Sequence, residues 1–194
     1  MAECVKCGND NPLQANACSA CTWPLALSGW KSTTRLRRVT LDTGCVNAKG
    51  RDADLNTLER WNVVGLIELQ RSEAMLDELE GEARVAKARA LQPHPGLFTP
   101  DVSVLDGPDV LAGPDMPIEL KGILFPTASP LTDNQRHDVE HLSLHVRTGG
   151  DVFVTHNPND FITRGRQEEL RSHGIWVMAP SELVGLLTEL CGWA

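Results

Sequence analysis

Short apolar runs alternate with helix-like segments along most of this chain, and this alternation restricts the possible folds more than any other feature. The first run, at about 37–43, contains Leu41-Asp42. Similar short runs cover 66–70, 151–155 and 175–178. Strands that alternate with helices favour a parallel α/β sheet, in which ligands bind at the carboxyl ends of the strands. We therefore expect Asp42 to lie at the carboxyl end of a central strand.

The segments between these runs carry helix caps and a helical spacing of apolar residues. Asp52 or Asp54 is expected to cap a helix that ends near Gly65 and buries one face. The residues expected on that face are Leu55, Leu58 and Trp61. Further helices are expected over about 72–90, 132–149, 161–173 and 181–191.

Prolines interrupt this pattern between residues 92 and 117, where six of them occur together with three glycines. Such a composition predicts an irregular insertion, in which only 102–105 is expected to be ordered. The next segment, 118–125, is apolar enough for a strand or for a docking segment. The main domain is therefore expected to span 38–194, with this insertion near its middle.

The composition is that of a globular protein in water. The chain has 194 residues, of which 41% are hydrophobic and 23% charged, as in ordinary soluble domains. No apolar run approaches the ~20 residues of a membrane-spanning helix, and the first residues lack the apolar core of a signal peptide. We therefore expect a cytoplasmic protein without a membrane partner, in which cysteines are metal ligands or free thiols.

Two Cys-x-x-Cys pairs, separated by ten residues, lie near the amino terminus. Their cysteines are Cys4, Cys7, Cys18 and Cys21. This spacing lets four thiolates surround one ion at ~2.3 Å, and the metal would supply most of the folding energy of so short a segment. We predict a structural Zn²⁺ site within residues 1–30. Two disulfides or an iron site of the rubredoxin type are the alternatives.

The segment from Cys4 to Cys21 resembles the short zinc ribbons attached to many bacterial and archaeal proteins, although Thr22 stands where those ribbons usually carry glycine. The resemblance implies a ribbon that binds nucleic acid or protein. A basic linker follows at 31–37. The cations in and beside it are Lys31, Arg35, Arg37 and Arg38. Because the net charge is −8, RNA binding would need such a local basic patch; a solvated linker is the alternative.

Acidic residues fall at the ends of several expected elements. Asp42 and Asp160 each follow a strand, and Asp138 lies near the start of a helix, beside its apolar stripe. Three glutamates of the helix expected at 72–90 are candidates for a fourth position: Glu78, Glu80 and Glu82. Clustered carboxylates suit Mg²⁺ or Mn²⁺. Taken singly, each acid would be an ordinary solvated surface residue.

The order of these acids resembles that of the PIN-domain ribonucleases. Leu41-Asp42-Thr43 is similar to the opening strand motif of the family, and the stretch ending in Glu78-Leu79 is similar to its second motif. Asp138-Val-Glu-His-Leu resembles the third motif, and 151–161 resembles the closing strand with its Thr, Asn and Asp-Phe. The resemblance covers about 38–191 and selects Glu78 among the three glutamates.

Membership of this family would imply a PIN-like three-layer α/β fold and a metal-dependent endoribonuclease that cleaves single-stranded RNA. Asp42, Glu78 and Asp138 would hold one or two Mg²⁺ or Mn²⁺ ions, which orient a water for in-line attack on a phosphodiester. Asp160 would assist through a metal-bound water, and Thr155 would hydrogen-bond the site. RNA is the implied substrate, a protein inhibitor is a candidate partner, and an oligomer is compatible with the family.

Two positions depart from the family pattern. Gly44 replaces the polar residue that is common after Asp-Thr, and Asn157 stands where aspartate is often found. Asn157, a candidate for substrate contact together with Thr155, therefore competes with Asp160 for the fourth place. A weakened site of this kind predicts the alternative function, a PIN-like adaptor that binds RNA or protein without cleavage.

Two further motifs overlap the same residues. Asp42-Thr43-Gly44 also matches the aspartic-protease loop, but that chemistry needs a second such loop in an all-β barrel. His137-Asp-Val-Glu-His141 formally fits the zinc-peptidase motif His-x-x-Glu-His. Because these histidines lie opposite the apolar stripe of their helix, we expect them to point to solvent together with His145. A third protein ligand is not identifiable from the sequence.

Overall fold

The computed structural model describes the chain in separate stretches, and the fold is stated for these alone. They are residues 2–3, 9–11, 19–20, 37–48, 50–72, 74–94, 97–98, 110–111, 116–163 and 165–191. The four cysteines of the predicted zinc site, Lys31 and Arg35 lie outside them, so the ribbon and most of the basic linker stay predictions. Near the amino terminus, β1 (Ala2–Glu3) pairs antiparallel with β2 (Asp10–Asn11).

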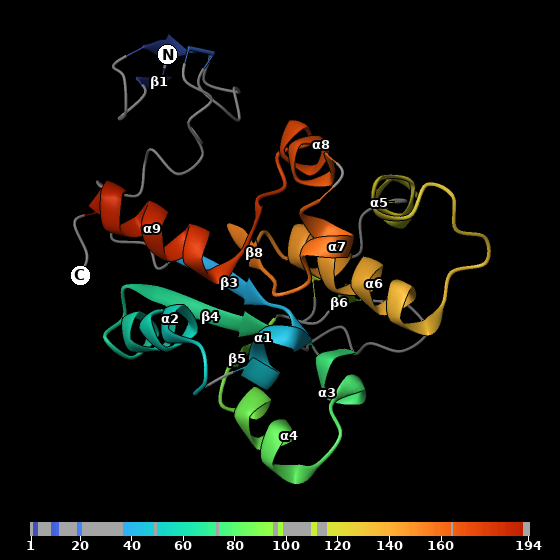
Figure 1. Cartoon of the computed structure of the whole chain (residues 1–194), viewed down its shortest axis with the longest axis horizontal. Helices are drawn as coiled ribbons and strands as arrows, with labels where there is room; N and C mark the ends of the chain where they lie inside the picture. The colour runs from blue at the N-terminus through green and yellow to red at the C-terminus, as the bar shows by residue number, and fades with distance from the viewer. Residues whose placement is uncertain are drawn as a thin grey trace.

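A five-stranded parallel sheet forms the centre of the main domain (Figure 1). In spatial order its strands are β5 (Gln92–Pro93), β4 (Ile67–Arg71), β3 (Arg37–Leu41), β8 (Val152–Val154) and β9 (Val177–Met178). The first strand of this sheet along the chain is the central strand β3. The strands β4 and β5 then follow on one side of it, and β8 and β9 follow on the other. In open parallel sheets, ligands bind at such a reversal, outside the carboxyl ends of the strands; here the reversal lies between β3 and β8. The expected α/β class with a parallel sheet is confirmed.

Helices cover both faces of this sheet. Side chains alternate along each strand, so each face carries apolar side chains that a layer of helices buries. On β8, Val152 and Val154 enter one core and Phe153 enters the other. The first core is completed by side chains of α2 (Ala53–Val63) and α9 (Pro180–Cys191). The second is completed by side chains of α5 (Met116–Leu124), α6 (Asp133–Arg147) and α8 (Arg166–Ser172). The short helix α1 (Thr43–Ala48) begins one residue after Asp42.

The expected helix caps are present at α2 and α6. The Asp52 carboxylate accepts from the Leu55 N–H at 2.8 Å and begins α2, whose three expected apolar side chains are buried. Thr132 begins α6 through a capping box with Gln135. These caps satisfy backbone donors that have no partner inside the helix.

Three expected elements differ from the observed ones. The single helix expected over 72–90 is divided into α3 (Ala74–Glu78) and α4 (Glu82–Arg89), because Gly81 takes a φ of 89° that helices do not contain. Residues 118–125 lie mostly in α5 instead of a strand, since Leu120, Ile123 and Leu124 are buried at helical spacing. The helix expected at 161–173 is shortened to α8, and the residues expected to form a turn before it contain the separate short helix α7 (Pro158–Phe161).

The proline-rich segment contains more regular structure than expected. Gln92–Pro93 forms the edge strand β5, where proline is tolerated. Two more short strands, β6 (Leu97–Phe98) and β7 (Val110–Leu111), pair in parallel. The expected ordered stretch 102–105 lies outside the described residues. No helix among the described stretches is long and apolar enough to cross a membrane.

Candidate functional site

Asp42 lies directly after β3, at the switch point of the sheet. Its N–H donates to the Val154 carbonyl at 2.9 Å. Its carboxylate, in a residue only 6% exposed, accepts from the Thr43 N–H and from the Thr155 hydroxyl, both at 2.8 Å. Burial raises the pKa of Asp42, while the Thr155 hydrogen bond and the charge of His141 act to lower it. A cation beside this carboxylate would restore stabilisation that burial removes.

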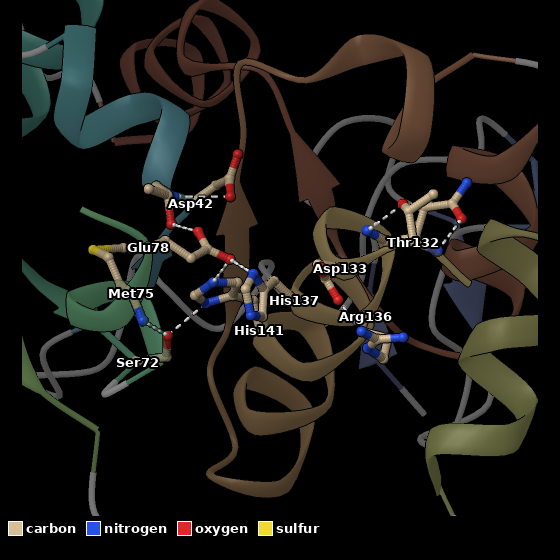
Figure 2. Close-up of polar contacts among 11 residues, drawn as sticks. Asp42, Ser72, Met75, Glu78, Thr132, Asp133, Arg136, His137 and His141 are labelled. Atoms are coloured by element: carbon tan, nitrogen blue, oxygen red, sulfur yellow. Dashed lines mark hydrogen bonds and ion pairs between the residues drawn. The ribbon is translucent and has the colours of Figure 1, made fainter. Parts of the chain in front are cut away.

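Glu78, the last residue of α3, lies beside Asp42, and its two carboxylate oxygens have different partners (Figure 2). Its Oε2 accepts from the Thr43 hydroxyl at 2.5 Å. Its Oε1 lies 3.0 Å from Nε2 of His141 and 3.0 Å from Nδ1 of His137. Burial opposes ionisation, but the hydrogen bonds from His141 and Thr43 outweigh it and lower the pKa of Glu78. Glu78 is therefore an anion at neutral pH.

Asp138, near the start of α6, experiences the charges of the other acids. Burial first, and then the negative charges of Asp42, Asp160 and Glu78, raise the pKa of Asp138 to about 7. Carboxylates perturb one another in this way only at short range. Asp42, Asp160 and Glu78, the other acids that the sequence analysis selected, are thus near enough to Asp138 for their charges to act on it. The other two glutamates considered are exposed: Glu80 and Glu82.

Asn157 and Asp160, the two candidates for the fourth place, form a hydrogen-bonded pair. Asn157 caps α7, where its side chain accepts from the Asp160 N–H at 3.4 Å and donates to Asp160 Oδ2 at 2.8 Å. The Asn157 N–H in turn donates to the Thr155 hydroxyl at 2.8 Å. Arg166 lies 3.7 Å from the second oxygen of Asp160. Asn157 therefore orients Asp160, and Asp160 presents the carboxylate.

The histidines of α6 are the feature that the sequence analysis missed. His141 and His145 are only 1% and 2% exposed, so the expectation that they point to solvent is wrong. The helix is buried on two sides, with Val139 and Leu142 in the second core and the histidine face directed toward the sheet and α3. The available signal was the spacing of His137, His141 and His145 by four residues, which puts them on one face.

Ser72 holds His141 from the side opposite Glu78. The Ser72 hydroxyl lies 2.5 Å from Nδ1 of His141 and accepts from the Met75 N–H at 3.2 Å. Burial disfavours protonation of His141, but the hydrogen bond and charge of Glu78 outweigh it and raise the pKa of His141. The ring is thus bound at both nitrogens, and its orientation toward Glu78 is fixed.

The predicted basic residues have structural contacts where the structure describes them. Arg38 lies within β3, where its N–H donates to the Asp151 carboxylate and its guanidinium donates to the Thr148 carbonyl, both at 2.8 Å. Arg37 begins the same strand. The contact of these two residues with RNA stays a prediction.

The acids fit a divalent cation by their chemistry. In the described part of the chain, no three His, Cys, Asp or Glu side chains form a group already arranged to hold an ion. The negative charges of Asp42 and Asp138 are nevertheless disfavoured by burial and by the neighbouring acids, a penalty that a bound cation removes. Gly44 keeps the space beside Asp42 open, since a Cβ there would lie 3.3 Å from Asp42 Oδ2.

Comparison with known proteins adds no identification. No protein-family model, curated protein or solved structure matches the chain. The assignment of function therefore rests on the chemistry and geometry of these side chains.

Proposed function

We propose that this protein is a metal-dependent endoribonuclease with a PIN-like main domain and an amino-terminal Cys4 zinc ribbon. One observation carries the proposal: Asp42, Glu78, Asp138 and Asp160 come from four separate segments, and the charges of the other three act on Asp138. Their position beside the β3–β8 switch point supports it, because that is where open parallel sheets bind ligands.

Asp42, Glu78 and Asp138 would hold one or two Mg²⁺ or Mn²⁺ ions. When bound, such ions activate a water and neutralise the charge on the leaving oxygen of a phosphodiester. Hydrogen bonds within the chain already orient two of the acidic side chains. Thr155 and the Thr43 N–H fix both oxygens of Asp42, and Asn157 fixes Asp160.

The decisive experiment is cleavage of generic single-stranded RNA in Mn²⁺, with and without EDTA. We expect Asp42→Asn and Asp138→Asn each to lower the cleavage rate at least about a hundredfold, because metal-held charge stabilisation contributes several kcal/mol. Glu140→Gln is the matched control, since Glu140 is an exposed acid two residues from Asp138 on the same helix, and it should leave the rate unchanged.

Two results would contradict the proposal. Cleavage that persists in Asp42→Asn or in EDTA would exclude the acidic site as its source. RNA binding without cleavage by the wild-type protein would favour the adaptor function instead.

A further inference from the structure

Two histidines from successive turns of α6 meet at a single oxygen atom of Glu78. Nδ1 of His137 and Nε2 of His141 each lie 3.0 Å from Glu78 Oε1. Figure 2 shows both rings directed at this carboxylate, with Asp42 on its other side. The third ligand that the His-x-x-Glu-His motif lacked is therefore supplied by α3, through tertiary packing. Two imidazoles and one carboxylate are a donor set found in transition-metal sites.

The surroundings of His141 are those of a metal ligand. Metal-binding histidines use one ring nitrogen for the ion and donate the other N–H to a second partner. Ser72 provides that partner at 2.5 Å from Nδ1, and the Met75 N–H fixes the hydroxyl in turn. When Nδ1–H donates to Ser72, the lone pair of Nε2 points toward Glu78.

The two carboxylate oxygens of Glu78 contact different groups. Its Oε2 is bound by the Thr43 hydroxyl on the Asp42 side, which leaves Oε1 for the histidines. The charges of Asp42 and Asp138 also act on His141, so a cation near Oε1 would be surrounded by negative charge. Mg²⁺ takes oxygen ligands almost exclusively, whereas imidazole favours transition metals.

We propose that Glu78, His137 and His141 close around a divalent transition-metal ion when one binds; without the ion, the two imidazoles contact Glu78 directly and the three side chains are not arranged around a metal position. The ion would replace the hydrogen bond between His141 and Glu78 and the contact between His137 and Glu78, as ligand imidazoles must be neutral to bind metal. This inference rests on the proposed function for the reaction that the ion serves, but the binding of the ion is tested independently of that reaction.

The test is a titration of the full chain with Mn²⁺, followed by pulsed electron paramagnetic resonance, which detects nitrogen bound to Mn²⁺. The wild-type protein should bind Mn²⁺ with a nitrogen coupling. His137→Ala should weaken binding at least about tenfold and reduce that coupling. His137 is the residue of choice, because its side chain is 37% exposed and its loss leaves the cores intact. His173→Ala, which removes an exposed histidine that caps α8, is the matched control.

The outcomes separate this site from the proposed activity. No Mn²⁺ binding by the wild-type protein, binding without nitrogen coupling, or equal affinity and coupling in His137→Ala would each overturn the site. RNA cleavage is measured on the same preparations. Nitrogen-coupled Mn²⁺ without cleavage would support the site and contradict the ribonuclease, whereas oxygen-only Mn²⁺ with cleavage would do the reverse.

Discussion

At the scale of single residues, the environment of each acid differs in a way that separates their chemical states. Hydrogen bonds from His141 and Thr43 hold Glu78 ionised, whereas burial and the neighbouring acids raise the pKa of Asp138 to about 7, close to neutral pH. Burial raises the pKa of Asp42, and the Thr155 hydrogen bond acts against that rise. Pairs of titratable groups with different environments are typical of catalytic sites.

Thr155 is the residue whose loss should affect Asp42 most directly. Thr155→Val keeps the shape of this fully buried side chain but removes the hydroxyl that donates to Asp42 and accepts from the Asn157 N–H. We expect a loss of about 1.5–3 kcal/mol of unfolding free energy, the usual effect of a lost hydrogen bond to a charged group. Urea unfolding measures it. Thr155→Ser retains the hydroxyl and should lose clearly less; equal losses would show that the hydroxyl is unimportant.

At the scale of elements, α6 carries most of the organisation of the site. Its second-core side, with Val139 and Leu142, fixes its distance from the neighbouring helices. Its histidine side then meets α3 through His141 and β3 through His145, whose Nδ1 lies 2.7 Å from the Thr40 hydroxyl. The turn that follows α6 has to pass close to this contact.

Gly150, in that turn, should therefore tolerate no side chain. A Cβ there would lie 2.3 Å from Nδ1 of His145 and 3.1 Å from the Thr40 hydroxyl. We expect Gly150→Ala to lower the unfolding free energy by about 1–3 kcal/mol, as overpacking does. The control is Gly185→Ala within α9, where a Cβ meets nothing within 4 Å. That change should raise stability by about 0.5–1 kcal/mol through helix propensity. Thermal unfolding of both variants tests whether Gly150→Ala lowers the melting temperature and Gly185→Ala raises it.

At the scale of the whole molecule, a second polar network lies inside the fold. The Thr40 hydroxyl contacts His94 at 2.9 Å as well as His145, and the Thr148 hydroxyl contacts the other nitrogen of His94 at 2.8 Å. Burial, with the charge of Arg38 next, lowers the pKa of His94 to about 4. Burial, with the proximity of His94 next, lowers the pKa of His145 to about 3. Both imidazoles are therefore neutral in the folded protein at neutral pH.

These histidines predict that the protein loses stability in acid. Below about pH 6.5 the unfolded chain binds protons on both imidazoles, whereas the folded chain does not until about pH 4 or below. The stabilising contribution is thus complete above pH 6.5 and is lost as the pH falls. For His94 alone, the unfolding free energy lost between neutral pH and about pH 4 is on the order of 3 kcal/mol.

The comparison is urea unfolding at neutral pH and near pH 4 for the wild type and His94→Gln. The variant side chain cannot be protonated, so the difference in unfolding free energy between the two pH values should shrink by about that amount. His173→Gln, a change at an exposed histidine, is the matched control. An unaltered pH dependence in His94→Gln would contradict the explanation.

Features that depend only on neighbouring residues could be predicted before the fold was known. Helix caps such as Asp52 and Thr132, the apolar stripe of α2 and the alternation of strands with helices act over a few residues, so their patterns are visible without a fold. The same local logic placed Asp42 after a strand. It failed at Gly81, where one residue with a positive φ divided an expected helix.

Which side chains meet could not be predicted in this way, because it depends on how the helices and the sheet pack. Whether His141 faced solvent or α3 depended on how α6 packs against two layers at once, and whether Glu78 or its neighbours reached the site depended on where α3 ends. The partners Ser72 and His141 are 69 residues apart in the chain. Contacts of this kind are set by the burial of whole elements, because each helix face gains a partner only when the layers assemble.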